Sequence, residues 1–286
     1  MDTDAVVKAA ESLTGMQVSR ITPLGGAAYR VTLNRDLDLV AKGHDRPDAV
    51  RAEAASLEWL AEPGTVPVPR LRGETPQLLL TDYVEPGGSS PSAAEALGRG
   101  LAGLHAAGAE AYGCPPPRGP EAASIGLAHM ANVKCEKWGD FYSRYRIEPY
   151  LRSAVDRGTI SSAQAGVFEE VMDRLDDLGG PAEPPARLHG DLWSGNVLWG
   201  ADGRAWLIDP AAHGGHRETD LAMLHLFGCP HLERILGAYR EAAPLADGWR
   251  ARIPLHQLFP LLVHTVLFGG GYAGQAIQAA RAALRA

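Results

Sequence analysis

Apolar positions in the first third of the chain follow a helical spacing first and a strand spacing afterwards. Val6, Ala10 and Leu13 share one side of a helix that ends at a glycine. The elements expected from this pattern are a helix at 3–14, strands at 18–24, 29–33 and 37–42, a helix at 48–61 and a strand at 77–83. This order predicts a small antiparallel sheet that carries one helix.

A change in composition separates this part from the rest of the chain. Residues 85–92 are rich in proline, glycine and serine, which is typical of a linker. Beyond them, helices are expected at 92–107, 136–155, 162–178, 219–227, 231–242 and 249–283, the last broken at three glycines, with a β-rich insert at 186–208. The pattern predicts an α+β protein with a small β-rich lobe at 1–84 and a large, mostly helical lobe at 85–286. A ligand cleft is expected between the two lobes.

Bulk composition narrows the class of protein without naming a function. Of the 286 residues, 45% are hydrophobic and 21% are charged, as in an ordinary globular protein. The formal net charge of −7 disfavours nucleic acid or an anionic membrane as the main partner. The N-terminus lacks a signal-peptide pattern, no apolar run approaches the ~20 residues that span a bilayer, and the three cysteines lack metal-ligand spacing. We therefore expect a cytoplasmic protein with no nucleic-acid partner and no membrane partner.

The strongest chemical signal lies at 189–196, which reads His-Gly-Asp-Leu-Trp-Ser-Gly-Asn. Its H-x-D-x-x-x-x-N spacing is that of the catalytic loop of protein-kinase-like phosphotransferases. Phosphoryl transfer needs a carboxylate that orients the acceptor hydroxyl and takes its proton, and Asp191 is the candidate. It also needs oxygen ligands for Mg²⁺, which Asn196 and Asp209 can supply. Each short motif alone is more often a turn, but the ordered pair predicts a kinase that uses ATP and Mg²⁺.

The expected sheet supplies candidates for holding the nucleotide phosphates. Lys42 ends the third strand, where kinases place the lysine that contacts the α- and β-phosphates, and Glu53 in the next helix is its candidate partner. Taken without the catalytic loop, the two are more simply a surface lysine and a surface glutamate. Gly25 and Gly26 lie where a phosphate-covering loop belongs, although two glycines between strands usually form only a hairpin turn.

The segment after the strand at 77–83 is the expected hinge of the cleft. A hinge offers backbone groups to an adenine ring, and Asp82 and Val84 are candidates on position alone. The segment between Asp209 and Asp220 has no Ala-Pro-Glu motif and is too short for a phosphorylated activation loop. We therefore expect an enzyme that is always active on a small acceptor bound in the cleft.

Three motifs in order resemble the fructosamine kinase (ketosamine-3-kinase) family, part of the aminoglycoside phosphotransferase-like group. They are the run at 189–196, Ile-Asp-Pro-Ala at 208–211 and Gly-His-Arg-Glu-Thr-Asp-Leu-Ala-Met at 215–223. Trp-Gly-Asp-Phe-Tyr-Ser-Arg-Tyr-Arg-Ile-Glu-Pro at 138–149, Leu-Ala-Gly-Leu-His at 101–105 and the segment 258–272 are also similar to that family. The resemblance covers nearly the whole chain.

The resemblance implies a protein-kinase-like fold and transfer from ATP, with Mg²⁺, to the 3-hydroxyl of a ketosamine. The acceptor would be a sugar joined to an amine by an Amadori linkage, either a small molecule or bound to a protein, and the reaction would be a deglycation step. Asp191 would be the base, Asn196 and Asp209 the metal ligands, and Lys42 with Glu53 the pair that positions the phosphates.

Four further residues near these motifs are candidates for contacting the substrate or for supporting the catalytic loop. Trp193 is a candidate wall for the sugar, with core packing as the alternative. Arg217 and Glu218 are candidate substrate contacts, with pairing to each other as the alternative. Asp220 is expected to cap the following helix and to brace the catalytic loop.

The glycine turn at 25–26 differs from that of the family, and two other functions remain alternatives. The turn at 25–26 runs straight into Ala-Ala-Tyr-Arg, so it is shorter than in the family, which leaves open a weaker grip on the γ-phosphate or another acceptor. A related kinase acting on an aminoglycoside-like or choline-like hydroxyl is the first alternative. A nucleotide-binding pseudokinase is the second, and the intact Lys42, Asp191 and Asp209 argue against it.

Overall fold

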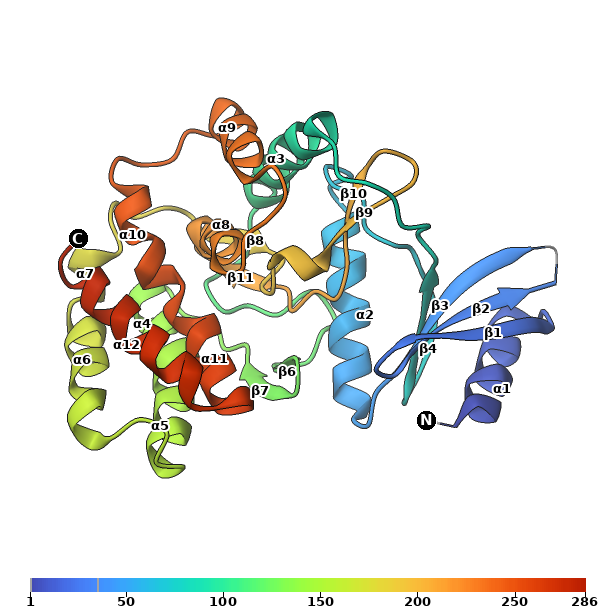
Figure 1. Ribbon diagram of the computed structural model, residues 1–286, viewed down its shortest axis with the longest axis horizontal. Coiled ribbons are helices and arrows are strands. Elements are labelled where there is room, and N and C mark those ends of the chain that lie inside the picture. The colour runs from blue at the N-terminus through green and yellow to red at the C-terminus, as the bar shows by residue number, and fades with distance from the viewer. Residues whose placement is uncertain (1, 35) are drawn as a thin grey trace.

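The computed structural model describes residues 2–34 and 36–286. Figure 1 shows the β-sheet and α1 at one end of an elongated molecule and the C-terminal helices at the other, with α2 between them. Among the described residues, no helix combines the length and the apolar character that crossing a membrane requires.

The N-terminal sheet has five antiparallel strands in the order β1-β2-β3-β5-β4. Its elements are α1 (Thr3–Thr14), β1 (Val18–Gly25), β2 (Ala28–Leu33), β3 (Leu37–Gly43), α2 (Pro47–Ala61), β4 (Leu71–Thr75) and β5 (Leu78–Asp82). α1 packs Val6 and Ala10 against Val31, Leu39 and Leu80 on one face of the sheet. The predicted helices and strands are all present here. β4 was not predicted, because this edge strand is only partly buried and carries alternate charged residues.

The helical part contains short β-ladders that position its loops. Its helices are α3 (Pro91–Ala106), α4 (Trp138–Tyr142), a π-helical turn (Ser143–Ile147), α5 (Glu148–Asp156), α6 (Ser162–Asp173), α7 (Leu175–Leu178), α8 (Arg217–Leu226), α9 (Leu232–Ala242), α10 (Trp249–His256), α11 (Leu258–Phe268) and α12 (Gly270–Ala283). Its strands are β6 (Ala122–Ile125), β7 (Ala128–Ala131), β8 (Ala186–Leu188), β9 (Val197–Trp199), β10 (Ala205–Leu207) and β11 (His213–Gly215), with a 3₁₀ turn at Ser194–Asn196.

Three predicted helices are interrupted in the structure. The π-helical turn divides the helix predicted at 136–155, and a break after 173 divides the one at 162–178. The helix predicted at 249–283 is divided into three helices. One break is at Gly269, as the run of three glycines predicted, because its φ of +91° lies outside the helical region. The β6–β7 hairpin was not predicted from its two four-residue strands.

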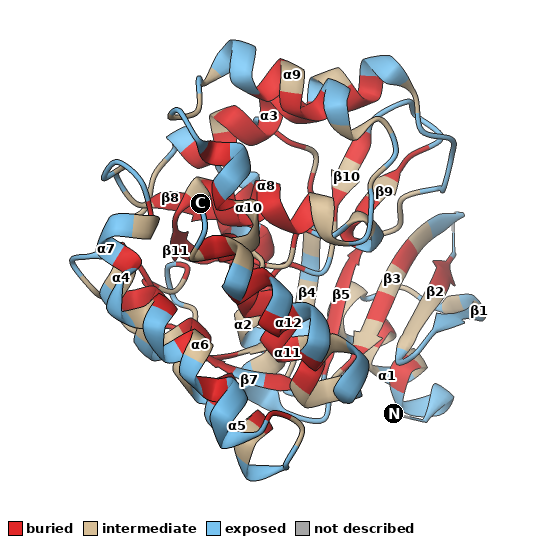
Figure 2. Ribbon diagram, turned by 60° about the vertical axis from the view of Figure 1, so that its left-hand side comes forward, coloured by how far each residue is buried: buried red, intermediate tan, exposed pale blue. Residues whose placement is uncertain are grey.

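Two large hydrophobic cores hold the helical part together, and one of them includes α2. Val50, Leu57 and Leu60 of α2 share a core with Leu101 of α3 and Leu207 of β10. Figure 2 shows buried residues running through α3, α8 and α11. The division of the chain at residue 84 stays a prediction, because α2 packs with helices from beyond it.

Candidate active site

The catalytic loop follows β8 directly, and Asp220 of α8 holds its backbone. The Asp220 carboxylate accepts hydrogen bonds from the backbone N–H groups of His189 and Gly190, at 2.7 and 3.0 Å. Gly190 has φ of +82°, and a Cβ there would lie 2.1 Å from a backbone carbonyl oxygen, so glycine is required. The predicted bracing by Asp220 is confirmed. Its predicted capping of α8 is wrong, because the side chain of His216 accepts the cap hydrogen bond.

Asp191 and Asn196 lie side by side in this loop. The Asn196 amide donates to the Asp191 backbone oxygen at 2.8 Å and to its carboxylate Oδ2 at 3.1 Å. This arrangement leaves Asp191 Oδ1 for an acceptor hydroxyl and Asn196 Oδ1 for a cation. Burial raises the pKa of Asp191 to about 6, although the Asn196 hydrogen bond opposes the rise. The carboxylate is therefore mostly ionised at neutral pH and able to accept a proton.

Lys42 joins the sheet to α2 and to the segment after β10 through two carboxylates. Its Nζ lies 2.9 Å from Glu53 Oε2 in α2 and 3.0 Å from Asp209 Oδ1 after β10. Burial alone lowers the pKa of Lys42, but the charges of Glu53 and Asp209 outweigh it and raise that pKa. His44 also contacts Glu53, at 3.0 Å. The structure thus brings the predicted lysine, its predicted partner and a predicted metal ligand into direct contact.

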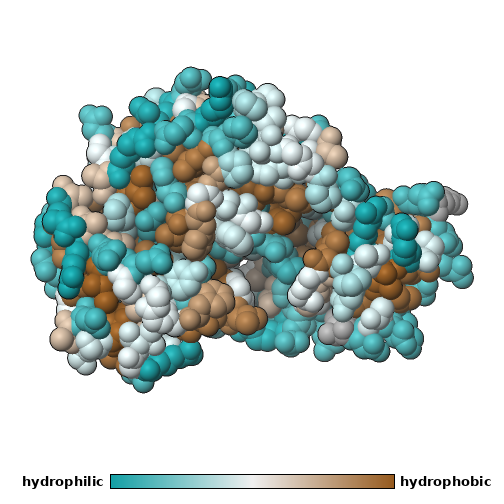
Figure 3. Space-filling view, viewed as in Figure 1, coloured by the Kyte–Doolittle hydropathy of each residue, from teal (hydrophilic) through white to brown (hydrophobic). Residues whose placement is uncertain are grey.

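A cavity of about 530 Å³ lies between the sheet and the segment that includes Leu198, Ile208 and Asp209. Gly25, Gly26 and Val84 line it together with Lys42 and Asp209. Figure 3 shows apolar side chains around the hollow between the two parts of the molecule. Asp82 also lines the cavity, and its carboxylate Oδ1 accepts a hydrogen bond from Arg72.

A second cavity of about 450 Å³ adjoins the first across Lys42, Glu53 and Asp209. Asp191 and Asn196 line this second cavity only. The arrangement therefore has one cavity on each side of a Lys–Asp contact, and the candidate base faces the second. Such a pair of adjoining cavities suits a nucleotide and an acceptor.

Trp193 lines the second cavity and is 38% exposed. Its ring packs edge-on against Phe227, with centroids 5.9 Å apart. The core-packing alternative for this residue is therefore wrong, and its position as a cavity wall fits the geometry.

Comparison with known proteins identifies the family. The model of the family described as "Fructosamine kinase" matches residues 11–286. The chain belongs to the fructosamine kinase family. It is therefore a phosphotransferase that acts on a hydroxyl acceptor, as the resemblance of its motifs predicted.

Two solved structures and one curated relative are similar to this chain. A Thermobifida fusca crystal structure, whose title names a candidate fructosamine-3-kinase, is 46% identical over 100% of both chains, with a TM-score of 0.94. A chloroplastic protein-ribulosamine 3-kinase of Arabidopsis thaliana is 30% identical and covers 91% of this chain and 81% of its own. A choline kinase of Streptococcus pneumoniae is 16% identical over 99% of both chains, with a TM-score of 0.68, and shares the fold. The predicted protein-kinase-like α+β fold is confirmed.

Two residues of a motif that resembles the fructosamine kinase family lie outside both cavities. Arg217 is bound by Glu183, with nitrogen–oxygen distances of 2.6 Å, and Glu218 by Arg252 at 2.6 and 2.9 Å. Neither residue lines the cavity beside Asp191. The predicted pairing of Arg217 with Glu218 is wrong, because adjacent residues on a helix point in different directions. The proposed site therefore does not include Arg217 or Glu218 as substrate contacts.

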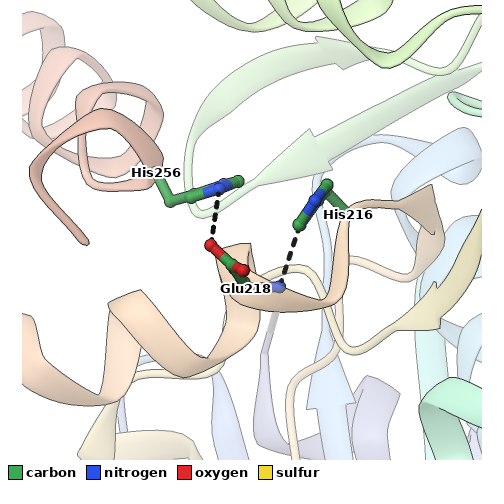
Figure 4. A group of neighbouring side chains, drawn as sticks. All are labelled: His216, Glu218 and His256. Atoms are coloured by element: carbon green, nitrogen blue, oxygen red, sulfur yellow. Dashed lines mark hydrogen bonds and ion pairs between the residues drawn. The ribbon is translucent and has the colours of Figure 1, made fainter. Parts of the chain in front are cut away.

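Glu218 belongs instead to a buried cluster with His216 and His256, shown in Figure 4. The ligand atoms of the three residues lie within 4.8 Å of one another, which is compatible with a metal ion. However, the Arg252 guanidinium already binds both Glu218 oxygens, and a buried divalent cation would meet this positive charge. Burial alone raises the pKa of Glu218, but hydrogen bonds from His256 and Arg252 lower it to about 2. The cluster is therefore a buried ion-pair network in this member of the fructosamine kinase family.

We expect Arg252→Met to destabilise the protein by about 3–5 kcal/mol, because it leaves the Glu218 carboxylate buried without its partner. Urea unfolding at pH 7 measures the change. The lowered folded-state pKa of Glu218 means that the pair stabilises the fold above the ordinary value of 4.5 and that this stability is lost as the pH falls towards 2.

Arg250→Met is the matched control for this variant. Arg250 pairs with Glu233, and both side chains are more than half exposed, so its loss should cost about 0–1 kcal/mol. Equal losses in the two variants would contradict a stabilising role for the buried pair.

Several residues that line the second cavity were not predicted. His44 and His264 are among them, and so is Phe268, which is 68% exposed. In the sequence alone, a single histidine after a strand or an aromatic residue at a helix end gives no indication that it belongs to a functional site. The segment 258–272 was singled out only by its similarity to the fructosamine kinase family, and that similarity was the available signal.

Proposed function

We propose that this chain transfers the γ-phosphoryl group of ATP to the 3-hydroxyl of a ketosamine of the fructosamine or ribulosamine type. One observation carries the proposal. Lys42, held by Glu53 and Asp209, stands at the border of two cavities, and Asp191 faces the second one. This is the arrangement that phosphoryl transfer from a nucleotide to a small acceptor requires.

The first cavity is the proposed ATP site. Lys42 would contact the α- and β-phosphates, and Gly25 and Gly26 would cover them from the β1–β2 turn. Both glycines have positive φ, +122° and +54°, which lets the backbone turn tightly beside the phosphates. The backbone of Val84 would meet the adenine ring, since the neighbouring Tyr83 N–H is already used by Asp38 at 3.3 Å.

Asn196 and Asp209 fit a magnesium ion by the chemistry of their free donor atoms. The Asn196 NH₂ group is bound to Asp191, so its carbonyl oxygen is free, and the Asp209 carboxylate is about half exposed. An amide oxygen and a carboxylate oxygen are the hard ligands that Mg²⁺ prefers. Mg²⁺ held by these two residues would neutralise negative charge on the nucleotide phosphates.

The acceptor hydroxyl would lie in the second cavity, against Asp191. Asp191 Oδ1 accepts the hydroxyl hydrogen bond and orients the oxygen, while Asn196 fixes the other carboxylate oxygen. As the new oxygen–phosphorus bond forms and the bond to ADP breaks, the hydroxyl proton passes to Asp191. Lys42 offsets the negative charge that develops on the phosphates. Trp193 would form the wall along the sugar.

The relatives support the choice of acceptor. The Arabidopsis relative is named for a 3-kinase reaction on ribulosamines, and the Thermobifida structure for one on fructosamines. The choline kinase shares only the fold, so it does not argue for choline as the acceptor.

The experiment is ATP consumption against fructosyl-lysine, ribulosyl-lysine, an aminoglycoside and choline, each with and without Mg²⁺. We expect turnover that requires Mg²⁺ on the ketosamines alone. Turnover only on the aminoglycoside or on choline would overturn the proposed acceptor and keep the kinase. ATP binding without turnover of any compound would indicate a pseudokinase.

A further inference from the structure

Exposed apolar side chains gather at the mouth of the second cavity. Six large hydrophobic side chains are exposed among the described residues, and three of them, Leu127, Trp193 and Phe268, line this cavity. A fourth, Phe227, packs edge-on against Trp193. Isolated exposed apolar residues are ordinary on a protein surface, but a group around one cavity indicates a binding surface.

Five aromatic rings form a continuous group there, which we call the aromatic rim: Trp193, Phe227, His264, Phe268 and Tyr272. The ring of His264 is central, with centroids 5.2 Å from Phe227, 5.4 Å from Phe268 and 5.0 Å from Tyr272. The rings come from the catalytic loop, the end of α8, α11 and α12. The rim starts two residues after Asp191, so it extends outwards from the point where the acceptor hydroxyl would react.

The backbone and hydrogen bonds hold the rim in place. A Cβ at Gly195 would lie 2.1 Å from the Trp193 ring, so the indole lies directly over this glycine. His264 Nδ1–H donates to the Pro260 carbonyl at 2.7 Å, which fixes the plane of the central ring. Gly269, with φ of +91°, ends α11 immediately after Phe268. Trp193 and His264 are thus fixed in place, and together with Phe268 they are the rim residues that line the cavity.

The charges of the same cavity favour a cation. Asp191, Asp209 and Glu53 line it, and Lys42, the only lysine among the lining residues of the described chain, is held by two of these carboxylates. No arginine is among those lining residues. An aromatic face attracts an ammonium group, and neighbouring carboxylates add to the attraction. An anionic group on the amine would meet these carboxylates, and among the described residues that line the cavity it would find no lysine or arginine outside the Lys42 ion pairs.

We propose that the aromatic rim is the subsite for the amine half of the acceptor, an inference that rests on the proposed ketosamine kinase activity. The secondary amine of a ketosamine is protonated at neutral pH, and the rim would hold this ammonium together with an apolar substituent on it. The subsite therefore selects ketosamines of arylalkyl or aliphatic amines over ketosamines that carry a carboxylate beside the amine. Phe268 and Trp193 are its specificity-determining residues.

Steady-state kinetics on two ketosamines with the same sugar tests this inference. The substrates are the fructosamines of benzylamine and of glycine, and the enzymes are the wild type, Phe268→Ala, Phe268→Tyr and Leu37→Ala. We expect the wild type to prefer the benzylamine compound by at least about tenfold in kcat/KM. Phe268→Ala should raise KM for that compound about fivefold, the usual worth of one aromatic–aromatic contact with the benzyl group, with kcat changed less than about twofold.

The controls separate a subsite from a structural role. KM for ATP and KM for the glycine compound should change less than about twofold in Phe268→Ala, and Phe268→Tyr should keep the wild-type preference. Leu37→Ala removes another exposed apolar side chain, far along the sheet, and should leave every constant unchanged. Equal kcat/KM for both compounds in the wild type, or equal losses on both in Phe268→Ala, would overturn this inference alone. Absence of turnover on every ketosamine would overturn the proposed function and this inference together.

Discussion

Asp191→Ala is expected to lower kcat by about 10²- to 10⁴-fold, the usual contribution of a positioned acid–base group, while ATP binding is retained. The reason is the place of Asp191 in the structure. It lines the second cavity but not the first, and Asn196 fixes one of its carboxylate oxygens at 3.1 Å. Removing the carboxylate takes away the proton acceptor and the group that orients the hydroxyl. Single-turnover kinetics with a saturating ketosamine measure the loss, and equilibrium binding of ATP measures what is kept.

Asp176→Ala is the matched control, since that carboxylate is 74% exposed and forms an ion pair with Lys137 at 3.9 Å, away from both cavities. Its kcat should be that of the wild type. A kcat in Asp191→Ala within about threefold of the wild type would show that another group takes the proton. A loss of ATP binding in the same variant would show that Asp191 serves the nucleotide.

Asp209→Ala is expected to remove the effect of Mg²⁺ on ATP affinity. Mutation of a residue that only hydrogen-bonds to a metal ligand often lowers metal affinity 10- to 100-fold. Loss of a carboxylate ligand itself should therefore lower Mg²⁺ affinity by at least about that factor. Asp209 also contacts Lys42 at 3.0 Å, but Lys42 keeps its contact with Glu53 at 2.9 Å in this variant. The lysine should therefore stay in place, and the loss should be specific to the metal. Titration of ATP at several Mg²⁺ concentrations measures it.

Asp209→Asn retains one oxygen ligand and should show an intermediate Mg²⁺ dependence. An unchanged Mg²⁺ titration in Asp209→Ala would contradict the assignment of this carboxylate as a ligand. Loss of ATP binding in the absence of Mg²⁺ would show that Asp209 acts through Lys42 instead.

The parts of the site that could be predicted are those whose chemistry is local in sequence. Asp191 and Asn196 are five residues apart in one loop, and their hydrogen bond follows from that spacing. Lys42 and Glu53 were also predictable, because a strand followed by a helix that packs on the sheet brings residues eleven apart together. The two helices beside the sheet and four of its five strands followed in the same way from their periodicity, and β4 did not.

The parts that could not be predicted depend on contacts between distant elements. Glu218 was expected near the substrate, but its partner Arg252 lies 34 residues away on α10, and no local pattern joins the two. The aromatic rim is assembled from four separate segments, so each ring alone looks like an ordinary apolar residue. The π-helical turn at 143–147 interrupts a sequence whose apolar spacing is continuous, so that break left no signal either.

The position of the phosphate in the product is the most direct test of the proposed transfer to the 3-hydroxyl of a ketosamine. Fructosyl-lysine is incubated with ATP and Mg²⁺, and phosphorus–carbon couplings in the NMR spectrum of the product identify the phosphorylated carbon. We expect a single phosphate on the oxygen of C3, formed by the wild type and absent with Asp191→Ala. A phosphate on any other carbon, or no phosphorylated sugar from the wild type, would contradict it.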